Sequence, residues 1–547
     1  MAFESGSPPT PPDAPPREGI SRSAGAIGLA TLISRVAGFL RDILIARALG
    51  AGLAADAFFV AFAIPALFRN LFMEGALNSS LIPSYTEVRK EGGEAAARRF
   101  TGGVAVLVGV FLAAMCALGV LFSGTLVAIL ASGFSRQPEK FDLAVRLTRL
   151  MFPFLFFIGM WAIAAGLLNA ARRFFVPAVT PAVQNLVMVA ALLAAGWLGA
   201  GERAVYWLAA AVVAGGALQA LCQVPLLVRL GLFPAPAAPW SAPGIGRFLT
   251  LMGPAAFAAA IFHLNSLANR WLASFLEEGA ISYLYYANRL VQFPHGILSL
   301  AVMAAAFPVL AERAAEGRRN QEGAGEGWRR TLAESGRLTL YITLPATFGL
   351  IALAHPIMEV LFQRGAFGPG QTAASAAALR AYALGLAFFG FVRLFSAAFH
   401  TRLDTRYPMR CAYASVAANI AFSLILMFPL GFVGLALGTT LSSALNAVLL
   451  IRGLRRVGGE WPGEELGRAA RQLLLPAAGV GAAAWLAHWA LWPAGAPFAL
   501  RALALMIIVA AAAGSYALLC EWLAPQGKVP LRGLLRLGRR ASPSSSA

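Results

Sequence analysis

Long apolar runs recur along almost the whole chain of 547 residues. Most are about 20–28 residues long, and a helix of about 20 apolar residues crosses the roughly 30 Å hydrocarbon core of a bilayer. Hydrophobic residues make up 59 % of the chain and charged residues only 13 %, a balance that excludes an ordinary soluble protein. The sequence therefore predicts an all-α polytopic membrane protein.

Turn residues between the apolar runs divide them into fourteen predicted transmembrane helices. In chain order these are residues 25–50, 57–86, 101–132, 143–170, 176–200, 204–230, 246–275, 281–311, 332–362, 373–401, 408–430, 432–453, 470–492 and 498–523. The predicted domains are a Pro-rich disordered cytoplasmic tail at 1–22, an N-lobe of helices 1–6 at 23–230, a C-lobe of helices 7–12 at 246–456, helices 13 and 14 at 467–525, and a basic cytoplasmic tail at 526–547.

The loops between these helices differ in positive charge. With the N-terminus inside, about 29 of the 44 Lys and Arg residues fall in inside loops and tails, and only Arg136, Lys140, Arg203 and Arg364 fall in outside loops. Short cytoplasmic loops are enriched in Lys and Arg. We therefore expect both termini in the cytoplasm. This distribution also explains the formal charge of +19 without nucleic acid as a partner.

A faint internal repeat relates the two halves. Pro83, Glu87 and Gly92 match Pro308, Glu312 and Gly317 at an offset of 225 residues. Both segments belong to the second helix of their half and insert in the same sense. This pattern predicts two six-helix lobes related by a parallel repeat, as in two-lobed transporters, with the last two helices outside the repeat.

Charged residues inside the apolar runs mark the expected functional site. The densest stretch is 34–74, which carries Arg35, Arg41, Asp42, Arg47, Asp56, Arg69 and Glu74. Arg270 and Arg289 lie in the seventh and eighth predicted helices. A central Arg or Asp costs about 2.5–3.5 kcal/mol on membrane-insertion scales. Such residues persist where they face a watery cavity or a charged ligand.

A group of arginines at mid-membrane suits a diphosphate. The guanidinium fork pairs bidentately with phosphate oxygens and stays protonated in any dielectric. Asp42 and Asp56 are expected to hold these arginines apart when no ligand is present. Internal salt bridges that only fix helix packing are the alternative, and Arg47 is expected to extend to the membrane interface.

Other function classes find little support. The chain has no Walker A motif and no DxD or DDxxD arrangement for Mg²⁺, so we predict a transporter rather than an enzyme. The four cysteines lie far apart in apolar runs, and no metal site is predicted. No cofactor is expected. Coupling to the membrane potential or to Na⁺ stays open, and a sodium site is unassigned, although Asn419 and Thr439 are possible contributors.

Several motifs resemble the MurJ (MviN) lipid II flippases. They are SRxxGxxRD at 34–42, GAGxxxDAFFVAF at 50–62, Pro65 with Arg69, EGA at 74–76, YYANRLxxFPxG at 285–296 and LFQRGxF at 361–367. The similarity covers about residues 22–525. It implies the two-lobed fold of the MOP exporter superfamily, with helices 13 and 14 flanking a groove for the lipid tail.

The resemblance also implies an activity and its residues. The activity is movement of undecaprenyl-diphosphate-linked peptidoglycan precursor, lipid II, from the cytoplasmic to the outer leaflet by alternating access. The implied substrate-binding residues are Arg35, Arg41, Asp42, Asp56, Arg69, Glu74 and Arg289. Ser34, Gly38, Asn288 and Pro294 are expected to serve gating or packing. Asn288 departs from the family, which often has Asp there, so one local counter-charge for Arg289 is missing.

The expected partners are lipid II, anionic lipids at the basic cytoplasmic face and the cell-wall synthesis machinery. Three alternatives remain open: a flippase for another polyprenyl-diphosphate-linked glycan, a MATE-like antiporter, or a non-transporting cell-wall scaffold. An antiporter of cationic drugs favours acidic cavity residues, whereas this chain favours Arg. A scaffold needs no arginine at mid-membrane.

Overall fold

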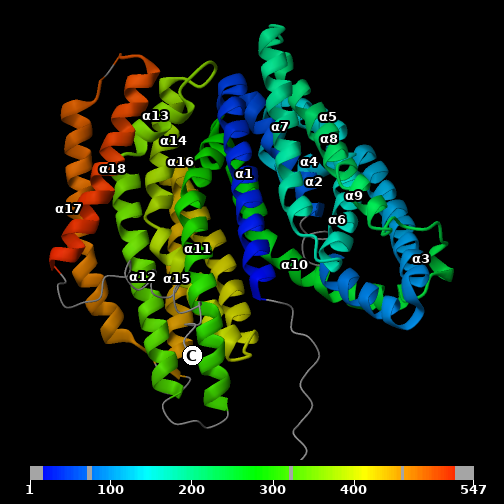
Figure 1. The fold of residues 1–547 in the computed structure, drawn as a ribbon. Coiled ribbons are helices and arrows are strands. Elements are labelled where there is room, and N and C mark those ends of the chain that lie inside the picture. The colour runs from blue at the N-terminus through cyan, green and yellow to red at the C-terminus, as the bar shows by residue number, and fades with distance from the viewer. Residues whose placement is uncertain (1–16, 70–76, 319–323, 457–460, 494, 524–547) are drawn as a thin grey trace, which may run out of the picture. The chain divides into compact units, whose positions relative to one another are not determined.

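The computed structural model describes residues 17–69, 77–318, 324–456, 461–493 and 495–523 (Figure 1). The described part is helical and contains no strand, which confirms the all-α fold class. In it, seven helices are long and apolar enough to cross a membrane, or up to nine if each of two bent pairs is one span. The count of fourteen therefore stays a prediction. The two tails of the chain fall largely outside the described residues.

Contacts between Cα atoms divide the chain into two units. Unit 1 consists of the residues up to Leu44, Phe62–Ser123 and Arg146–Ile261. Unit 2 consists of Ile45–Ala61, Gly124–Val145 and the residues from Phe262 onward. Unit 2 therefore includes two stretches from the first half of the chain: residues 45–61, which end the first helix and begin the second, and residues 124–145. The domain boundaries predicted from sequence stay predictions.

Unit 1 is built from parts of several long helices. Its helices are the first part of α1 (Arg17–Leu49), the second part of α2 (Leu53–Arg69), α3 (Asn78–Leu121), the end of α5 (Pro138–Met151), α6 (Phe154–Ala170), α7 (Phe175–Trp197), α8 (Ala204–Leu221), α9 (Val224–Arg229) and the first part of α10 (Ile245–Ala273). Helix α6 packs against α3 and α8, and α8 packs against α7. Gly93 bends α3 with a φ of 73°, in the left-handed region that glycine tolerates.

Unit 2 holds the remaining helices. They are α4 (Ser123–Leu130), α11 (Ala280–Arg318), α12 (Ala324–Ala352), α13 (Ala354–Phe362), α14 (Pro369–Ala383), α15 (Leu386–Thr401), α16 (Arg406–Arg456), α17 (Gly463–Leu491) and α18 (Phe498–Leu523). Helices α12 and α13 meet at an angle of 74°, and α14 and α15 at 41°. In α16, Gly431 has a φ of 55° and breaks the helix, at the boundary predicted between residues 430 and 432.

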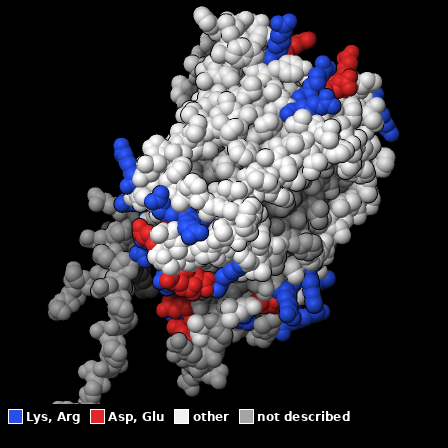
Figure 2. Space-filling model, turned by 90° about the vertical axis from the view of Figure 1, so that its right-hand side faces the viewer, with Lys and Arg blue, Asp and Glu red and all other residues white. Residues whose placement is uncertain are grey.

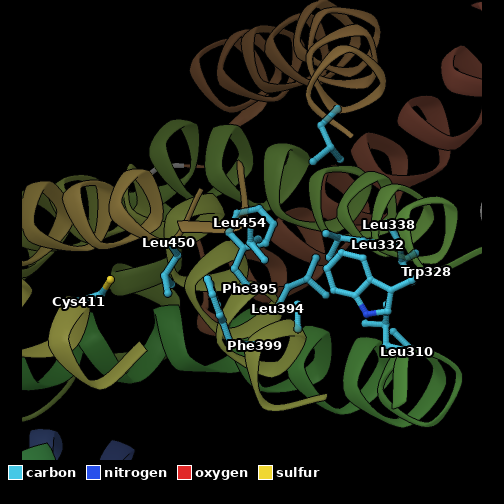
Figure 3. Close-up of a cluster of buried hydrophobic side chains, with 13 residues drawn as sticks. Leu310, Trp328, Leu332, Leu338, Leu394, Phe395, Phe399, Cys411, Leu450 and Leu454 are labelled. Carbon is cyan, nitrogen blue, oxygen red and sulfur yellow. The ribbon is translucent and has the colours of Figure 1, made fainter. Parts of the chain in front are cut away.

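Large apolar side chains fix the centre of unit 2. Leu310, Trp328, Leu394, Phe395 and Leu450 belong to one buried cluster supplied by α11, α12, α15 and α16 (Figure 3). Each such side chain stabilises the fold by about 1.5–3 kcal/mol when it leaves water. Helix α17 packs along α12 and pairs with α18, as Figure 1 shows at the orange and red end of the chain.

The surface of the helices is apolar where a membrane would contact it. Val110, Leu121, Leu221, Met506 and Ile507 are all more than half exposed. On the face drawn in Figure 2, the Lys, Arg, Asp and Glu side chains gather in separate zones and leave a band of other residues between them. Exposed apolar side chains in this quantity suit contact with lipid rather than water.

Candidate functional site

In unit 1, the predicted residues Ser34, Arg41 and Asp42 meet around a side chain of α7. Arg41 donates hydrogen bonds from Nε and Nη2 to Oδ1 of Asp42, at 3.0 and 2.6 Å. Its Nη1 donates to Oδ1 of Asn185, at 2.9 Å. The Nδ2 of Asn185 in turn donates to the carbonyl oxygen of Ser34, at 3.3 Å. These four residues form what we call the α1–α7 polar cluster.

Burial makes this cluster energetically important. Asp42 has a side-chain exposure of 0 % and Arg41 of 11 %. Neither charge is tolerable in an apolar helix pair unless both are paired and hydrogen-bonded. Ser34 and Arg41 are seven residues apart, which is about two turns, so they share one face of α1. In this structure Asp42 therefore pairs with Arg41, the arginine beside it in the sequence.

In unit 2, the predicted residue Asp56 is buried at the beginning of α2 and binds the start of α11. Its Oδ2 accepts hydrogen bonds from Nζ of Lys140 at 2.7 Å and from the backbone nitrogen of Gly279 at 2.8 Å. Its Oδ1 accepts from the backbone nitrogen and the hydroxyl of Ser282, at 2.9 and 2.6 Å. We call these four residues the Asp56 clasp.

The clasp satisfies two electrostatic needs at once. The first N–H groups of a helix lack partners within the helix and carry partial positive charge, which a carboxylate neutralises. Lys140, 3 % exposed, supplies the full positive charge that a buried Asp56 requires. The sequence predicts that Asp42 and Asp56 hold the arginines apart; the cation that pairs with Asp56 in this structure is Lys140. The clasp joins α2, α5 and α11 within unit 2.

Aromatic and backbone contacts reinforce the same junction. The rings of Phe59 and Tyr285 stack with centroids 4.0 Å apart. The hydroxyl of Tyr286 donates to the carbonyl oxygen of Gly50 at 3.1 Å. Gly50 has a φ of +66°, and a Cβ there would lie 2.5 Å from the carbonyl oxygen of Ala366. This turn therefore requires glycine both for its conformation and for its space.

The other predicted residues are divided between the two units. Gly38 is buried in α1, whereas Arg35 is exposed, and Arg69 is the last residue of α2, so these three belong to unit 1. Asn288, Arg289 and Pro294 all lie within α11 in unit 2, where Asn288 is exposed and Arg289 half-buried. Glu74 lies outside the described residues.

The position of Arg289 links it to the Asp56 clasp along one helix. It follows Ser282 by seven residues, about two turns, and therefore shares its face of α11. Arg289 and the Asp56 clasp are therefore joined by about two turns of one helix.

Sequence reasoning missed Lys140, Asn185, Gly279 and Ser282. Lys140 was counted only as one of four positive charges in outside loops. Asn185 had a usable signal, as a polar residue inside the apolar run 176–200. Gly279 and Ser282 flank the first residues of a predicted helix, where a carboxylate is favoured. Nothing in the local sequence indicates that this carboxylate comes from residue 56.

A neutral polar cluster surrounds the residues considered for sodium. Nδ2 of Asn269 and of Asn419 both donate to Oγ1 of Thr439, at 3.1 and 3.3 Å. The Oδ1 atoms of Asn269 and Asn419 are buried without a hydrogen-bond partner in the described part of the chain. The described residues contain no group of three or more His, Cys, Asp or Glu side chains placed to hold a metal ion. Any cation here would be bound by neutral oxygens.

The family model and the related sequences that match this chain all name the same protein family. The family model for lipid II flippase MurJ matches residues 45–504. A probable lipid II flippase MurJ of Rhizobium meliloti (strain 1021) is 37 % identical over 498 residues, covering 90 % of this chain and 91 % of that protein. One from Vibrio cholerae serotype O1 is 34 % identical over 445 residues, covering 80 % and 83 %.

Solved structures agree on the fold. A lipid II flippase MurJ in an inward closed conformation superposes with a TM-score of 0.74 at 24 % identity, covering 91 % of this chain and 98 % of that one. An inward-facing multidrug resistance MATE family transporter of the MOP superfamily superposes with a TM-score of 0.61 at 15 % identity, covering 80 % and 96 %. At these identities the likeness establishes the fold alone.

Proposed function

The chain belongs to the MurJ family of lipid II flippases, and from this premise we propose that it moves lipid II from the cytoplasmic to the outer leaflet of the bacterial inner membrane. It is a transporter and not an enzyme. The structural observation that supports this proposal is the buried α1–α7 polar cluster. In it, Asp42 and Asn185 bind the Arg41 guanidinium between apolar helices.

We propose that Arg41 exchanges partners when substrate binds. Its fork now holds a carboxylate and an amide, and a diphosphate offers oxygens of the same geometry with more charge. A charge-assisted hydrogen bond contributes about 1.5–3 kcal/mol, and each bond from Arg41 to the diphosphate would replace one of the bonds that Arg41 now donates to Asp42 and Asn185. Arg35, Arg69, Glu74 and Arg289 stay proposed as further substrate-binding residues.

For alternating access, we propose that the Asp56 clasp is one of the contacts that must break. The clasp ties residues 45–61 and 124–145 to the start of α11, and its ion pair is buried. Opening it would expose Asp56 and Lys140 to water, which lowers the cost of separating them. Gly38 and Ser34 in α1 and Pro294 in α11 are proposed to accommodate the accompanying bends.

Orientation and partners follow from the same proposal. Both termini lie in the cytoplasm, because the short loops on that side carry most of the Lys and Arg. That basic face attracts anionic lipids, and the cell-wall synthesis machinery is the expected recipient or supplier of the substrate. No organic cofactor is needed. We propose that transport is coupled to the membrane potential or to Na⁺, with the oxygens of Asn269, Asn419 and Thr439 as candidate ligands.

The test is complementation. Cells depleted of their own lipid II flippase should grow when this chain is expressed, and should not grow with Arg41→Ala at the same protein level. A matched control is Arg203→Ala, since Arg203 is exposed on a loop of unit 1. Failure of the wild-type chain to restore growth, with the protein present in the membrane, would refute the proposal.

A further inference from the structure

Three arginines from separate segments gather at one end of unit 2. They are Arg47 in the last turn of α1, Arg364 between α13 and α14, and Arg501 in the first turn of α18. The backbone nitrogen of Ala366 donates to the carbonyl oxygen of Arg47 at 2.9 Å. The guanidinium of Arg364 lies 4.4 Å from the ring centroid of Phe498, three residues before Arg501 and on the same face of α18.

These cations carry more charge than their neighbours neutralise. Arg501 donates from Nη1 to Oε1 of Glu359 at 2.6 Å, and this carboxylate also lies 3.8 Å from His355. Arg364 donates from Nη2 to the carbonyl oxygen of Val360, which has no net charge. Burial lowers the pKa of the Arg364 guanidinium, and the positive charges of Arg47 and Arg501 lower it further. Among the described contacts of this cluster, three cations therefore face one carboxylate.

The helix ends add to the positive potential. Helices α14 and α18 both begin at this end, and neither has an acidic residue in its first turn. Nearby, by contrast, the start of α2 is bound by Glu278, whose Oε1 accepts from the backbone nitrogen of Leu53 at 2.8 Å, and the start of α11 by Asp56. A cation in the first turn of a helix opposes the helix dipole. The buried Nε of Arg501 also has no hydrogen-bond partner in the described part of unit 2.

We propose that Arg47, Arg364 and Arg501 bind the phosphate headgroup of a membrane lipid at the outer face of the membrane. Guanidinium groups and helix N-termini are both preferred partners of phosphate. Leu500, Leu503 and Ile507 are each about half exposed on the face of α18 that points away from Phe498 and Arg501, where they suit contact with the surrounding lipid chains.

The inference rests on the proposed function and its orientation, which place this end of unit 2 outside. Two lipids carry the required chemistry there: the diphosphate lipid that has just been moved, and a resident anionic phospholipid. In the first case the site receives the substrate as it leaves. In the second it binds the protein to its surrounding leaflet.

Native mass spectrometry of the full chain in nanodiscs tests the site, because it counts each bound lipid. The nanodiscs are made of phosphatidylcholine in both arms of the experiment. One arm contains a trace of undecaprenyl diphosphate, and the other contains a trace of phosphatidylglycerol. The variant is Arg47→Gln combined with Arg364→Gln, which leaves the Arg501–Glu359 pair intact. The control is Arg203→Gln. A thermal melt of each variant establishes that it is folded.

The double variant should lose one bound molecule of the added anionic lipid, and its affinity for that lipid should fall about tenfold for each arginine removed. The control should keep this lipid. The arm that shows the loss identifies the lipid. Equal counts for wild type and double variant in both arms overturn the proposal and leave the arginines as interfacial anchors. Because binding is measured directly, a chain that fails complementation but shows this loss would refute the transport function and keep the site.

Discussion

Lys140 and Asp56 form a buried ion pair, with 2.7 Å between Nζ and Oδ2 and neither side chain more than 3 % exposed. The two residues are 84 positions apart in the chain. The lysine approaches a carboxylate that already accepts three hydrogen bonds, one from Gly279 just before α11 and two from Ser282 in its first turn. The pair therefore does not stand alone, and the two residues should respond differently to substitution.

Asp56→Asn should destabilise the folded protein more than Lys140→Met. The Asn variant leaves a buried ammonium without a counter-charge, at a cost of about 3–5 kcal/mol. The Met variant also leaves a buried charge without its counter-charge, the Asp56 carboxylate, but that carboxylate keeps three hydrogen bonds from Gly279 and Ser282 and the partial positive charge of the helix start. Thermal melts of the two purified variants in the same detergent measure the loss of stability in each. A larger loss for Lys140→Met would show that the lysine, not the helix start, is the main partner of Asp56.

Gly133→Ala should lower the melting temperature, whereas Gly124→Ala should not. A Cβ on Gly133 would lie 2.1 Å from the backbone oxygen of Ser274, and nothing lies within 4 Å of the corresponding position at Gly124. Overpacking against backbone typically costs about 1–3 kcal/mol. Both glycines belong to the same segment of unit 2, so they form a matched pair. Equal melting temperatures would mean that the Gly133 contact relaxes freely.

Cysteine labelling from outside should reach Glu202→Cys but not Glu326→Cys. Both positions are exposed, and the loop charges place residue 202 outside and residue 326 inside. The background needs Cys222→Ser, because Cys222 is exposed. The reverse labelling pattern would overturn the orientation and the direction of transport.

Arg69→Lys should bind lipid II about tenfold or more weakly, and Arg69→Ala more weakly still. If Arg69 contacts phosphate through both arms of its fork, a lysine keeps the charge and loses one hydrogen bond of about 1.5–3 kcal/mol. Binding to purified variants at fixed salt measures this. Equal affinity of wild type and the Lys variant would leave only a general electrostatic role for Arg69.

The sequence predicted the helical class well because apolar runs and turn residues are local signals. The break at Gly431 and the bend at Gly93 both coincide with predicted turns. The sequence also places Arg41 next to Asp42, and the structure pairs these two side chains. The sequence could not predict Asn185 as the second partner of Arg41, because that pairing joins α1 to α7 across 144 positions.

The partners of Asp56, and the cluster of Arg47, Arg364 and Arg501, could not be predicted either, because they also join residues that are distant in the sequence. Both depend on which helix ends meet in unit 2, and the sequence contains only a preference for carboxylates at helix starts. Arg364 even belongs to a recognised motif, LFQRGxF, but its neighbours Arg47 and Arg501 come from distant segments.

The central claim is that this chain moves lipid II and needs the Arg41 guanidinium to do so. The most direct measurement is the fraction of lipid II that an externally added lipid II-cleaving enzyme can reach in cells depleted of their own flippase. Expression of the wild-type chain should restore cleavage, and Arg41→Ala, present in the membrane at the same level, should leave lipid II protected. Protection that persists with the wild-type chain, or cleavage that is fully restored by Arg41→Ala, would contradict the account.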